Sequence, residues 1–349
     1  MKDAKSDRKN MVQLKSFYLF IISMVLQAGL FPMASREWIS YGLFSLMTLG
    51  LGLFTFAMAG NKKRQTTNSM KGSRELMWLR LKKNKTAMVA MGVLIFLSYL
   101  TVLAPFITPQ NPLDTDWGAL SQGISTTHWL GTDDMGRDIF ARTLFGIRVA
   151  MGIGVTAVVL NTLIGTFLGL MAGYYGGKTD TLIMRLLEVW NAIPFILLAI
   201  AIMAALGTGI GKLILIVSLS NLMAFARIIR GSVLTVKEHD YIAAARVIGI
   251  SDAGIIIRHV LPNCISPILV LASLSIGETI LVIAGLSFLG LGIQPPMPSL
   301  GGMLANGQQF LHENFLMSLV PGVTILLIVL SFNLFGDGVR DALDSRLND

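Results

Sequence analysis

Long apolar runs are the feature that most restricts the folds open to this chain. A helix needs about 20 mostly apolar residues to cross the hydrocarbon core of a membrane. Eight runs approach or exceed that length: 17–34, 39–60, 86–107, 149–174, 186–206, 212–229, 265–291 and 315–335. Only 14% of the residues are charged, against about 25% in soluble domains. The sequence therefore predicts an all-α protein that crosses a membrane several times.

The basic residues indicate which ends of the runs face the cytoplasm. Of the 28 Lys and Arg residues, 23 fall in five segments that flank the runs: 1–16, 61–85, 175–185, 227–264 and 336–349. Loops that stay in the cytoplasm are enriched in Lys and Arg. We therefore expect a multi-pass membrane protein with both termini in the cytoplasm. The net charge of +8 then reflects topology, so we expect membrane lipid and not nucleic acid as its neighbour.

The first two runs are predicted to form a unit of their own. A basic start followed by an apolar run is typical of a cleaved signal peptide, but Pro32 stands where a small residue is expected and a second run follows. We expect residues 1–73 to form a basic N-terminus and a retained transmembrane hairpin. Residues 74–349 then form the core, with an external loop at 108–146 and a cytoplasmic region at 228–264.

A polar segment between the sixth and seventh runs, HDYIAAARVIGISDAGIIIRHVLPN at 239–263, carries the signals of a folded unit. Asp240 can cap a first helix, and Gly249 suits the left-handed residue that ends one. Ser251 can cap a second helix, and Pro262 is expected to end or redirect it. The segment therefore predicts two short helices joined at a glycine.

Three consecutive alanines, Ala243 to Ala245, give the first of these helices a flat face that a partner can approach closely. Ile255, Ile256 and Val260 can anchor the second helix against the membrane domain. An amphipathic helix laid in a partner's groove is a common mode of recognition. A loop at the membrane surface carries the same pattern, so the residues by themselves leave both interpretations open.

The spacing within this segment resembles the cytoplasmic motif of permease subunits in ATP-binding-cassette importers. Gly249 and Leu261–Pro262 fall in register with that motif, while Ala243 replaces its usual Glu and His259 its usual Ile. Four further segments resemble the dipeptide/oligopeptide/nickel permease family, and the resemblance covers residues 74–349. These segments are HWLGTDDMGRDIFARTLFGIR (128–148), GYYGGKTDTLIMR (173–185), LSFLGLGIQPP (286–296) and FNLFGDGVRDALDSRL (332–347).

The resemblance implies a six-helix permease core of the type I importer kind, to which the N-terminal hairpin is added. It implies half of a pathway for peptides, with nickel or metal chelates as the alternative cargo. The implied partners are a homologous permease in a heterodimer, two cytoplasmic ATPases and an extracellular or periplasmic substrate-binding protein. The ATPases bind the ATP and Mg, so we expect no cofactor, metal or catalytic residue in this chain.

The resemblance also implies which residues dock on an ATPase. The helix at 240–249 is expected to lie in a cleft of one ATPase and to move as a rigid lever. The residues expected at this contact are Tyr241, Ala243, Ala244, Ala245, Gly249, Asp252, Leu261 and Pro262. An ion-coupled secondary transporter is the alternative from another class, although such folds usually have two repeated halves, and no internal repeat is evident in this sequence.

The segment GYYGGKTD contains Gly-Lys-Thr but does not fit a phosphate-binding loop. With Gly177 as the second glycine, that loop needs another glycine where this chain has Ala172. We therefore interpret the segment as a cytoplasmic turn between two membrane helices.

Two carboxylates fall inside the predicted spans. Glu188 is one helical turn from Arg185, with which we expect it to pair. Glu278 lies deeper, and a buried carboxylate in a membrane is a functional hypothesis by default. It is a candidate for the translocation path, where it would meet a cationic part of the substrate. A hydrogen bond to a neighbouring helix is the alternative.

The predicted external loop carries a cluster of charges around Asp134, Arg137 and Asp138. Local pairing between the aspartates and arginines is the expected role, and a metal site that includes His128 is the alternative. The resemblance adds that a substrate-binding protein approaches on this side. We therefore name Asp134, Arg137 and Asp138 as candidate contacts with it.

Overall fold

The structure, a computed structural model, describes residues 73–343. The predicted hairpin at 17–60 lies outside these residues. The described part is built from helices, and its one β-type contact is an isolated bridge between Thr132 and Asp138. The principal helices are α3 (Ser73–Lys83), α4 (Lys85–Ile107), α5 (Ile139–Tyr175), α6 (Gly177–Asn191), α7 (Phe195–Leu206), α8 (Ile210–Ser218), α9 (Leu222–Lys237), α10 (Asp240–Val247), α11 (Asp252–Ile255), a π-helical turn η1 (Ile256–Val260), α12 (Leu261–Phe288), α13 (Leu300–Gln309) and α14 (Leu316–Leu343).

Four of these helical stretches are long and apolar enough to cross a membrane singly: Lys85–Ile107, Ile139–Tyr175, Asp252–Phe288 and Leu316–Leu343. Two bent pairs, α6 with α7 and α8 with α9, raise the number to six if each pair is one span. These six correspond to the six runs predicted from residue 86 onward. The all-α, multi-pass prediction is therefore confirmed for the described residues.

The bent pairs correct the prediction of straight spans at 186–206 and 212–229. α6 and α7 meet at 84°, and the break falls at Ala192 to Pro194. Proline disfavours helical backbone in the residue before it and lacks the amide hydrogen that a helix interior needs. The apolar run continues through this break, so hydropathy alone conceals it. α8 and α9 meet at a milder 41°.

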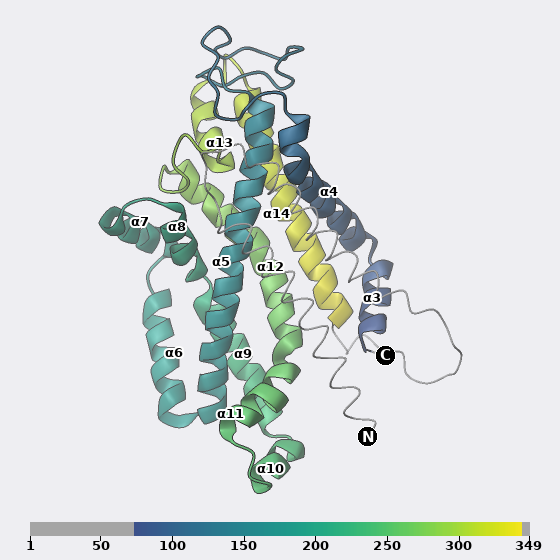
Figure 1. The fold of residues 1–349 in the computed structure, drawn as a ribbon. Coiled ribbons are helices and arrows are strands. Elements are labelled where there is room, and N and C mark those ends of the chain that lie inside the picture. Colours follow the sequence, from purple (N-terminus) through teal and green to yellow (C-terminus); the bar gives the residue numbers. More distant parts are fainter. Residues whose placement is uncertain (1–72, 344–349) are drawn as a thin grey trace, which may run out of the picture.

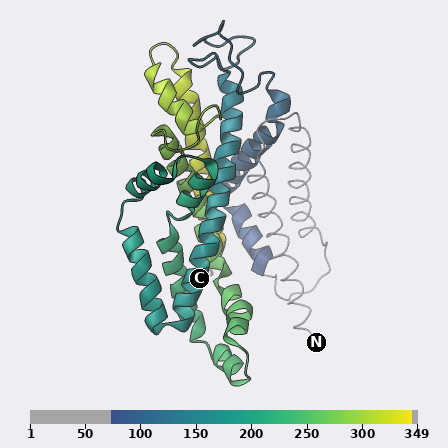
Figure 2. The same cartoon turned by 60° about the vertical axis from the view of Figure 1, so that its left-hand side comes forward.

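Helix α5 is longer than predicted and occupies the centre of the bundle (Figures 1 and 2). It begins at Ile139, not at 149, because Asp138 accepts a hydrogen bond from the amide of Ala141 and caps it. The predicted external loop 108–146 therefore ends at 138. In the most apolar stretch of α5, 78% of the residues are buried, against 22–39% in the other three single spans. The other helices thus form a shell around α5.

Three glycines spaced by four residues let α9 approach α5 closely. A Cβ on Gly165 would lie 2.5 Å from Cβ of Phe225, and one on Gly169 would lie 2.7 Å from the carbonyl oxygen of Ala226. At Gly173 the same atom would lie 2.7 Å from Cβ of Val233. Small residues at this spacing allow two membrane helices to pack backbone to backbone.

The two ends of the bundle differ in character (Figure 1). The segment that joins α4 to α5 gathers at one end, beside α13. Helix α10 projects at the other end, together with α11. A buried apolar cluster lies beneath α10, and we call it the basal cluster. Its members are Leu170, Tyr174, Ile229, Val233, Val236, Ile242, Ala245, Ile255, Ile256, Val260 and Cys264.

Candidate docking helix and external loop

Helix α10 begins one residue earlier than an Asp240 cap requires. Asp240 is its first residue, and His239 takes the capping position without a side-chain hydrogen bond. The prediction of an Asp240 cap is therefore wrong. A carboxylate in the first turn still interacts favourably with the helix dipole. The predicted left-handed glycine is confirmed, since Gly249 has a φ of 82° and its amide donates to the carbonyl of Arg246 at 3.0 Å.

The second predicted helix begins as expected but does not end at Pro262. The hydroxyl of Ser251 accepts a hydrogen bond from the amide of Gly254 and caps α11. The chain then continues through η1 into α12, with Pro262 in the first turn of α12. In the π-turn the amide of Leu261 donates five residues back, to Ile256. This altered pairing brings the proline into the helix without a break.

One face of α10 is fixed against its own protein. Ile242 is fully buried, and Ala245 is 3% exposed. Both belong to the basal cluster together with Ile255, Ile256 and Val260, so the predicted anchoring role of those three residues is confirmed. Ala245, named from the sequence as a docking residue, instead belongs to this internal face, because its neighbours in the fold already cover it.

The other face of α10 is exposed and more apolar than the alanines alone suggest. Val247 is 87% exposed and Ile248 is 75% exposed. They follow Ala243 and Ala244, which are also exposed, at the four-residue spacing of one helix face. We call Tyr241, Ala243, Ala244, Val247, Ile248 and Gly249 the α10 outer face. The sequence analysis missed Val247 and Ile248, although their spacing from the alanines was the signal.

Several contacts tie α10 and α11 to the rest of the protein. The hydroxyl of Tyr174, on α5, donates to the carboxylate of Asp252 at 2.6 Å. The guanidinium of Arg246 lies 5.5 Å from the centre of the same ring. Asp252, also named as a docking residue, therefore already has a partner within the chain. Leu261 packs against the basal cluster, and Pro262 is exposed at the start of α12.

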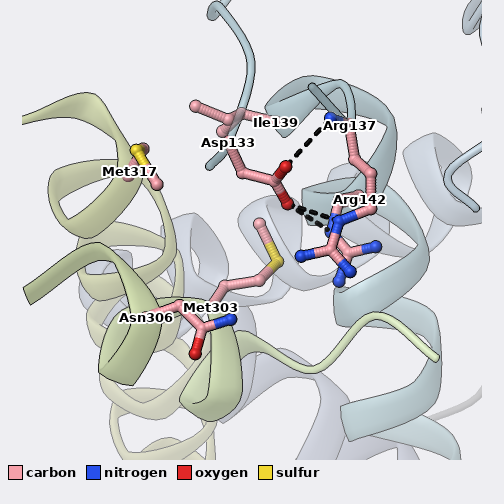
Figure 3. A pocket seen from close by; sticks show the side chains of 7 residues that line it. All are labelled: Asp133, Arg137, Ile139, Arg142, Met303, Asn306 and Met317. Carbon is pink, nitrogen blue, oxygen red and sulfur yellow. Dashed lines mark hydrogen bonds and ion pairs between the residues drawn. The ribbon is translucent and has the colours of Figure 1, made fainter. Parts of the chain in front are cut away.

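The opposite end of the bundle carries a buried network of charges (Figure 3). The carboxylate of Asp133 pairs with Arg137 at 2.7 Å and lies 3.5 Å from Arg142. Arg142, on α5, also donates to the carbonyl oxygen of Pro112 at 2.9 Å. These pairs confirm that local Asp–Arg pairing folds the loop. The sequence analysis missed the role of Arg142, which joins the loop to the central helix.

The candidate loop residues differ in how accessible they are. Arg137 and Asp138 are buried, and the Asp138 carboxylate accepts a hydrogen bond from Nδ1 of His128 at 2.9 Å. The Asp134 side chain is 22% exposed. Five large apolar side chains of the same loop are exposed: Trp117, Leu120, Ile124, Trp129 and Met135. Among residues 73–343 no group of three or more His, Cys, Asp or Glu side chains is placed to hold a metal.

The remaining predicted positions are placed as follows. Arg185 and Glu188 pair at 2.7 Å, as expected. The turn at Gly176 and Gly177 joins α5 to α6, and both glycines have positive φ. Glu278 on α12 is exposed in the isolated chain and accepts a hydrogen bond from Asn221 at 3.0 Å. Asn221 lies at the break between α8 and α9. The contact therefore matches the alternative given for Glu278 in the sequence analysis, a hydrogen bond to a neighbouring helix.

A buried central helix within a shell of membrane-length apolar helices defines a multi-pass membrane protein. The chain belongs to the family described as binding-protein-dependent transport system inner membrane component, which matches residues 165–349, more than half of its length. Residues 74–123 match the N-terminal transmembrane domain of oligopeptide transport permease C. It is therefore a permease of the ATP-binding-cassette importer kind, and the expectation drawn from the sequence motifs is confirmed.

Curated relatives agree with this assignment. The chain is 42% identical over 268 residues to the dipeptide transport system permease protein DppC of Alkalihalophilus pseudofirmus, covering 77% of this chain and 88% of that protein. It is 42% identical over 271 residues to the glutathione transport system permease protein GsiD of Pectobacterium atrosepticum, covering 77% and 90%. The GsiD of an Escherichia coli strain is 44% identical over 271 residues, covering 77% and 89%.

Proposed function

We propose that this chain forms half of the pathway of an ATP-driven, binding-protein-dependent importer of short peptides, coupled to an ATPase through α10. The observation that carries the coupling is the α10 outer face. Val247 and Ile248 place two large apolar side chains in water at one end of the bundle. Exposed apolar groups that gather on one face commonly mark a protein interface. The internal face of α10 is fixed, so the helix moves with the bundle.

The proposed assembly contains four other protein subunits besides this chain. They are a homologous permease in a heterodimer, two cytoplasmic ATPases that bind ATP and Mg, and a substrate-binding protein outside the membrane. Both termini and α10 then face the cytoplasm of a bacterial cell. The basic residues at the predicted inner ends of the runs support this orientation.

Peptides are the proposed cargo, since the relatives above are named for dipeptide and for glutathione transport. Both names describe short chains of amino acids with free carboxylates and an amino group. Nickel and metal chelates are the less favoured cargo. Uptake of labelled dipeptides and of glutathione, compared with uptake of nickel in the same vesicles, separates these substrate classes.

Two further contacts belong to the same proposal. Glu278 is proposed to line the path and to meet the amino group of the peptide, which its exposure at membrane depth supports. Glu278→Gln that transports every peptide at the unmodified rate would count against this role. Asp134 and the exposed apolar side chains of the same loop are proposed to meet the binding protein. Reversal of the charge at Asp134 with no change in uptake would remove Asp134 from that contact.

The test of the coupling uses the complete importer in proteoliposomes. We expect Val247→Asp to lower both the co-purification of the ATPase and the uptake by about tenfold, because a carboxylate in an apolar contact stays desolvated without a partner. Val247→Leu is the matched control and is expected to retain both. Full co-purification and uptake with Val247→Asp, or uptake that persists with a catalytically inactive ATPase, would overturn the proposed function.

A further inference from the structure

The central helix α5 has no direct chain connection to α10. The chain passes from α9 through Glu238 and His239 into α10, and then through α11 into α12. Movement of α10 therefore reaches α9 and α12 along the backbone. It reaches α5 only through non-covalent contacts, and the last turn of α5 makes polar contacts with α9, α10 and α11.

Three neighbouring elements meet that last turn. Nζ of Lys237, at the end of α9, lies 3.3 Å from the carbonyl oxygen of Tyr174 and 3.5 Å from that of Gly173. The guanidinium of Arg246, on α10, lies over the Tyr174 ring. The carboxylate of Asp252, at the start of α11, accepts the Tyr174 hydroxyl hydrogen. One tyrosine thus contacts the proposed docking helix α10 and the two helices, α9 and α11, that flank it in the chain.

We propose that Tyr174 is a positioning residue that transmits movement of α10 to the central helix α5, through its hydrogen bond with Asp252. This inference rests on the proposed function, because it takes α10 as the element that follows the ATPase. We call Tyr174 and Asp252, with Arg246 and Lys237 beside them, the Tyr174 joint.

The chemistry of the bond suits it to this task. A hydrogen bond from a hydroxyl to a carboxylate is short and directional, and 2.6 Å lies within the range of such charge-assisted bonds. The apolar contacts of the basal cluster hold α10 in place but are not directional, so the hydrogen bond adds a defined orientation between α11 and α5. The ring of Tyr174 is buried and Asp252 is exposed, so the bond itself is partly buried. The bond therefore resists separation of α11 from α5.

The surroundings of the joint hold the tyrosine in place. Its ring belongs to the basal cluster, and Gly173 next to it lies directly against α9. Removing only the hydroxyl therefore leaves the packing of the ring intact. This makes Tyr174→Phe a change in the bond alone. The adjacent Tyr175 is exposed, and its ring contacts that of Tyr174 edge to face. Tyr175→Phe removes an equal hydroxyl outside the joint and is the matched control.

The experiment measures peptide uptake per ATP hydrolysed, in proteoliposomes that hold the complete importer with its binding protein. We expect Tyr174→Phe and Asp252→Asn each to lower this ratio about tenfold, which corresponds to about 1.4 kcal/mol. The ratio is taken per assembled complex, so a variant that assembles poorly does not mimic the effect. Tyr175→Phe is expected to keep the unmodified ratio.

The double variant tests whether Tyr174 and Asp252 act through one shared bond. If one bond carries the effect, Tyr174→Phe combined with Asp252→Asn lowers the ratio no further than either change alone. An unchanged ratio in the single variants, or effects that multiply in the double variant, overturns the joint while uptake by the unmodified importer still depends on its ATPase. Loss of that dependence overturns the proposed function and the joint together.

Discussion

At the scale of single residues, the structure assigns different tasks to neighbours that look alike in the sequence. Ala243, Ala244 and Ala245 are consecutive, yet only Ala245 is buried. Successive residues of a helix point about 100° apart, so three alanines cannot share one flat face. The large exposed side chains at Val247 and Ile248 complete the face that Ala243 and Ala244 begin.

Gly249 supports a prediction at this scale. Its φ of 82° is left-handed, and open space surrounds the position where a Cβ would lie. The left-handed backbone conformation, and not a lack of space, therefore restricts which residues can replace Gly249. We expect Gly249→Asn to retain coupling and Gly249→Val to lose it, because Asn adopts left-handed backbone readily and a β-branched residue does not.

The measurement is ATPase co-purification and uptake with each Gly249 variant, in equal amounts of permease. Retained function in Gly249→Val would show that the corner after α10 tolerates another backbone conformation. Equal loss in Gly249→Asn would point to a direct contact of the glycine with the ATPase.

At the scale of elements, α5 and α9 make a close contact that extends over three glycines of α5. A Cβ on Gly169 would meet the carbonyl oxygen of Ala226 at 2.7 Å and Cβ of Ile229 at 2.8 Å. A backbone atom has little room to move away. The two helices therefore have to separate if any side chain is added here.

We expect Gly169→Ala to destabilise the permease by about 1–3 kcal/mol, the usual cost of overpacking a well-packed core. Gly285→Ala, on α12, is the matched control, because nothing lies within 4 Å of its added Cβ. Thermal unfolding of the purified complex measures both. Equal stability of the two variants would contradict the tight α5–α9 contact.

The sequence predicts the presence of the membrane helices well and the breaks and starts of those helices poorly. Six of the eight apolar runs fall in the described residues and correspond to helices there. They are easy to find because a helix that crosses the membrane needs about 20 mostly apolar residues in a row. The break at Pro194 and the early start of α5 at Ile139 were missed. The break depends on Pro194, which lies inside an apolar run that hydropathy treats as one helix. The start of α5 depends on the Asp138 cap, which lies in a polar segment that hydropathy treats as a loop.

In the candidate sites, too, local features were predictable from the sequence and contacts between distant residues were not. Gly249 and the Ser251 cap were predictable because they are local devices with a residue signature. The roles of Tyr174 and Arg142 were not, since their partners Asp252 and Pro112 are 78 and 30 residues away. Only the folded chain brings these groups together.

At the scale of the whole molecule, the single cysteine makes the orientation directly testable. Cys264 is the one cysteine in the sequence, and it is buried. Cys264→Ala therefore gives a cysteine-free background at a small cost in packing. Trp117, in the segment between α4 and α5, and Val247, on α10, are both strongly exposed. These two segments lie at opposite ends of the bundle (Figure 1).

In that background we expect Trp117→Cys to react with a membrane-impermeant thiol reagent added outside intact cells. Val247→Cys is expected to react only after the membrane is opened, because α10 faces the cytoplasm in the proposed topology. The unsubstituted Cys264→Ala background is the control for labelling of other proteins. The reverse pattern of labelling would invert the topology and remove α10 from reach of a cytoplasmic ATPase.

The bend between α6 and α7 has a consequence for the bilayer itself. Helix α6 has 15 residues, so it rises about 22 Å, whereas the hydrocarbon layer is about 30 Å thick. α7 turns away by 84°, so with α6 upright it runs nearly parallel to the membrane surface. Leu186, Val189 and Leu197 on this pair expose apolar side chains. The wall on this side thus stops short of the far leaflet, and sealing the gap against leakage falls to whatever lies beside α6 and α7.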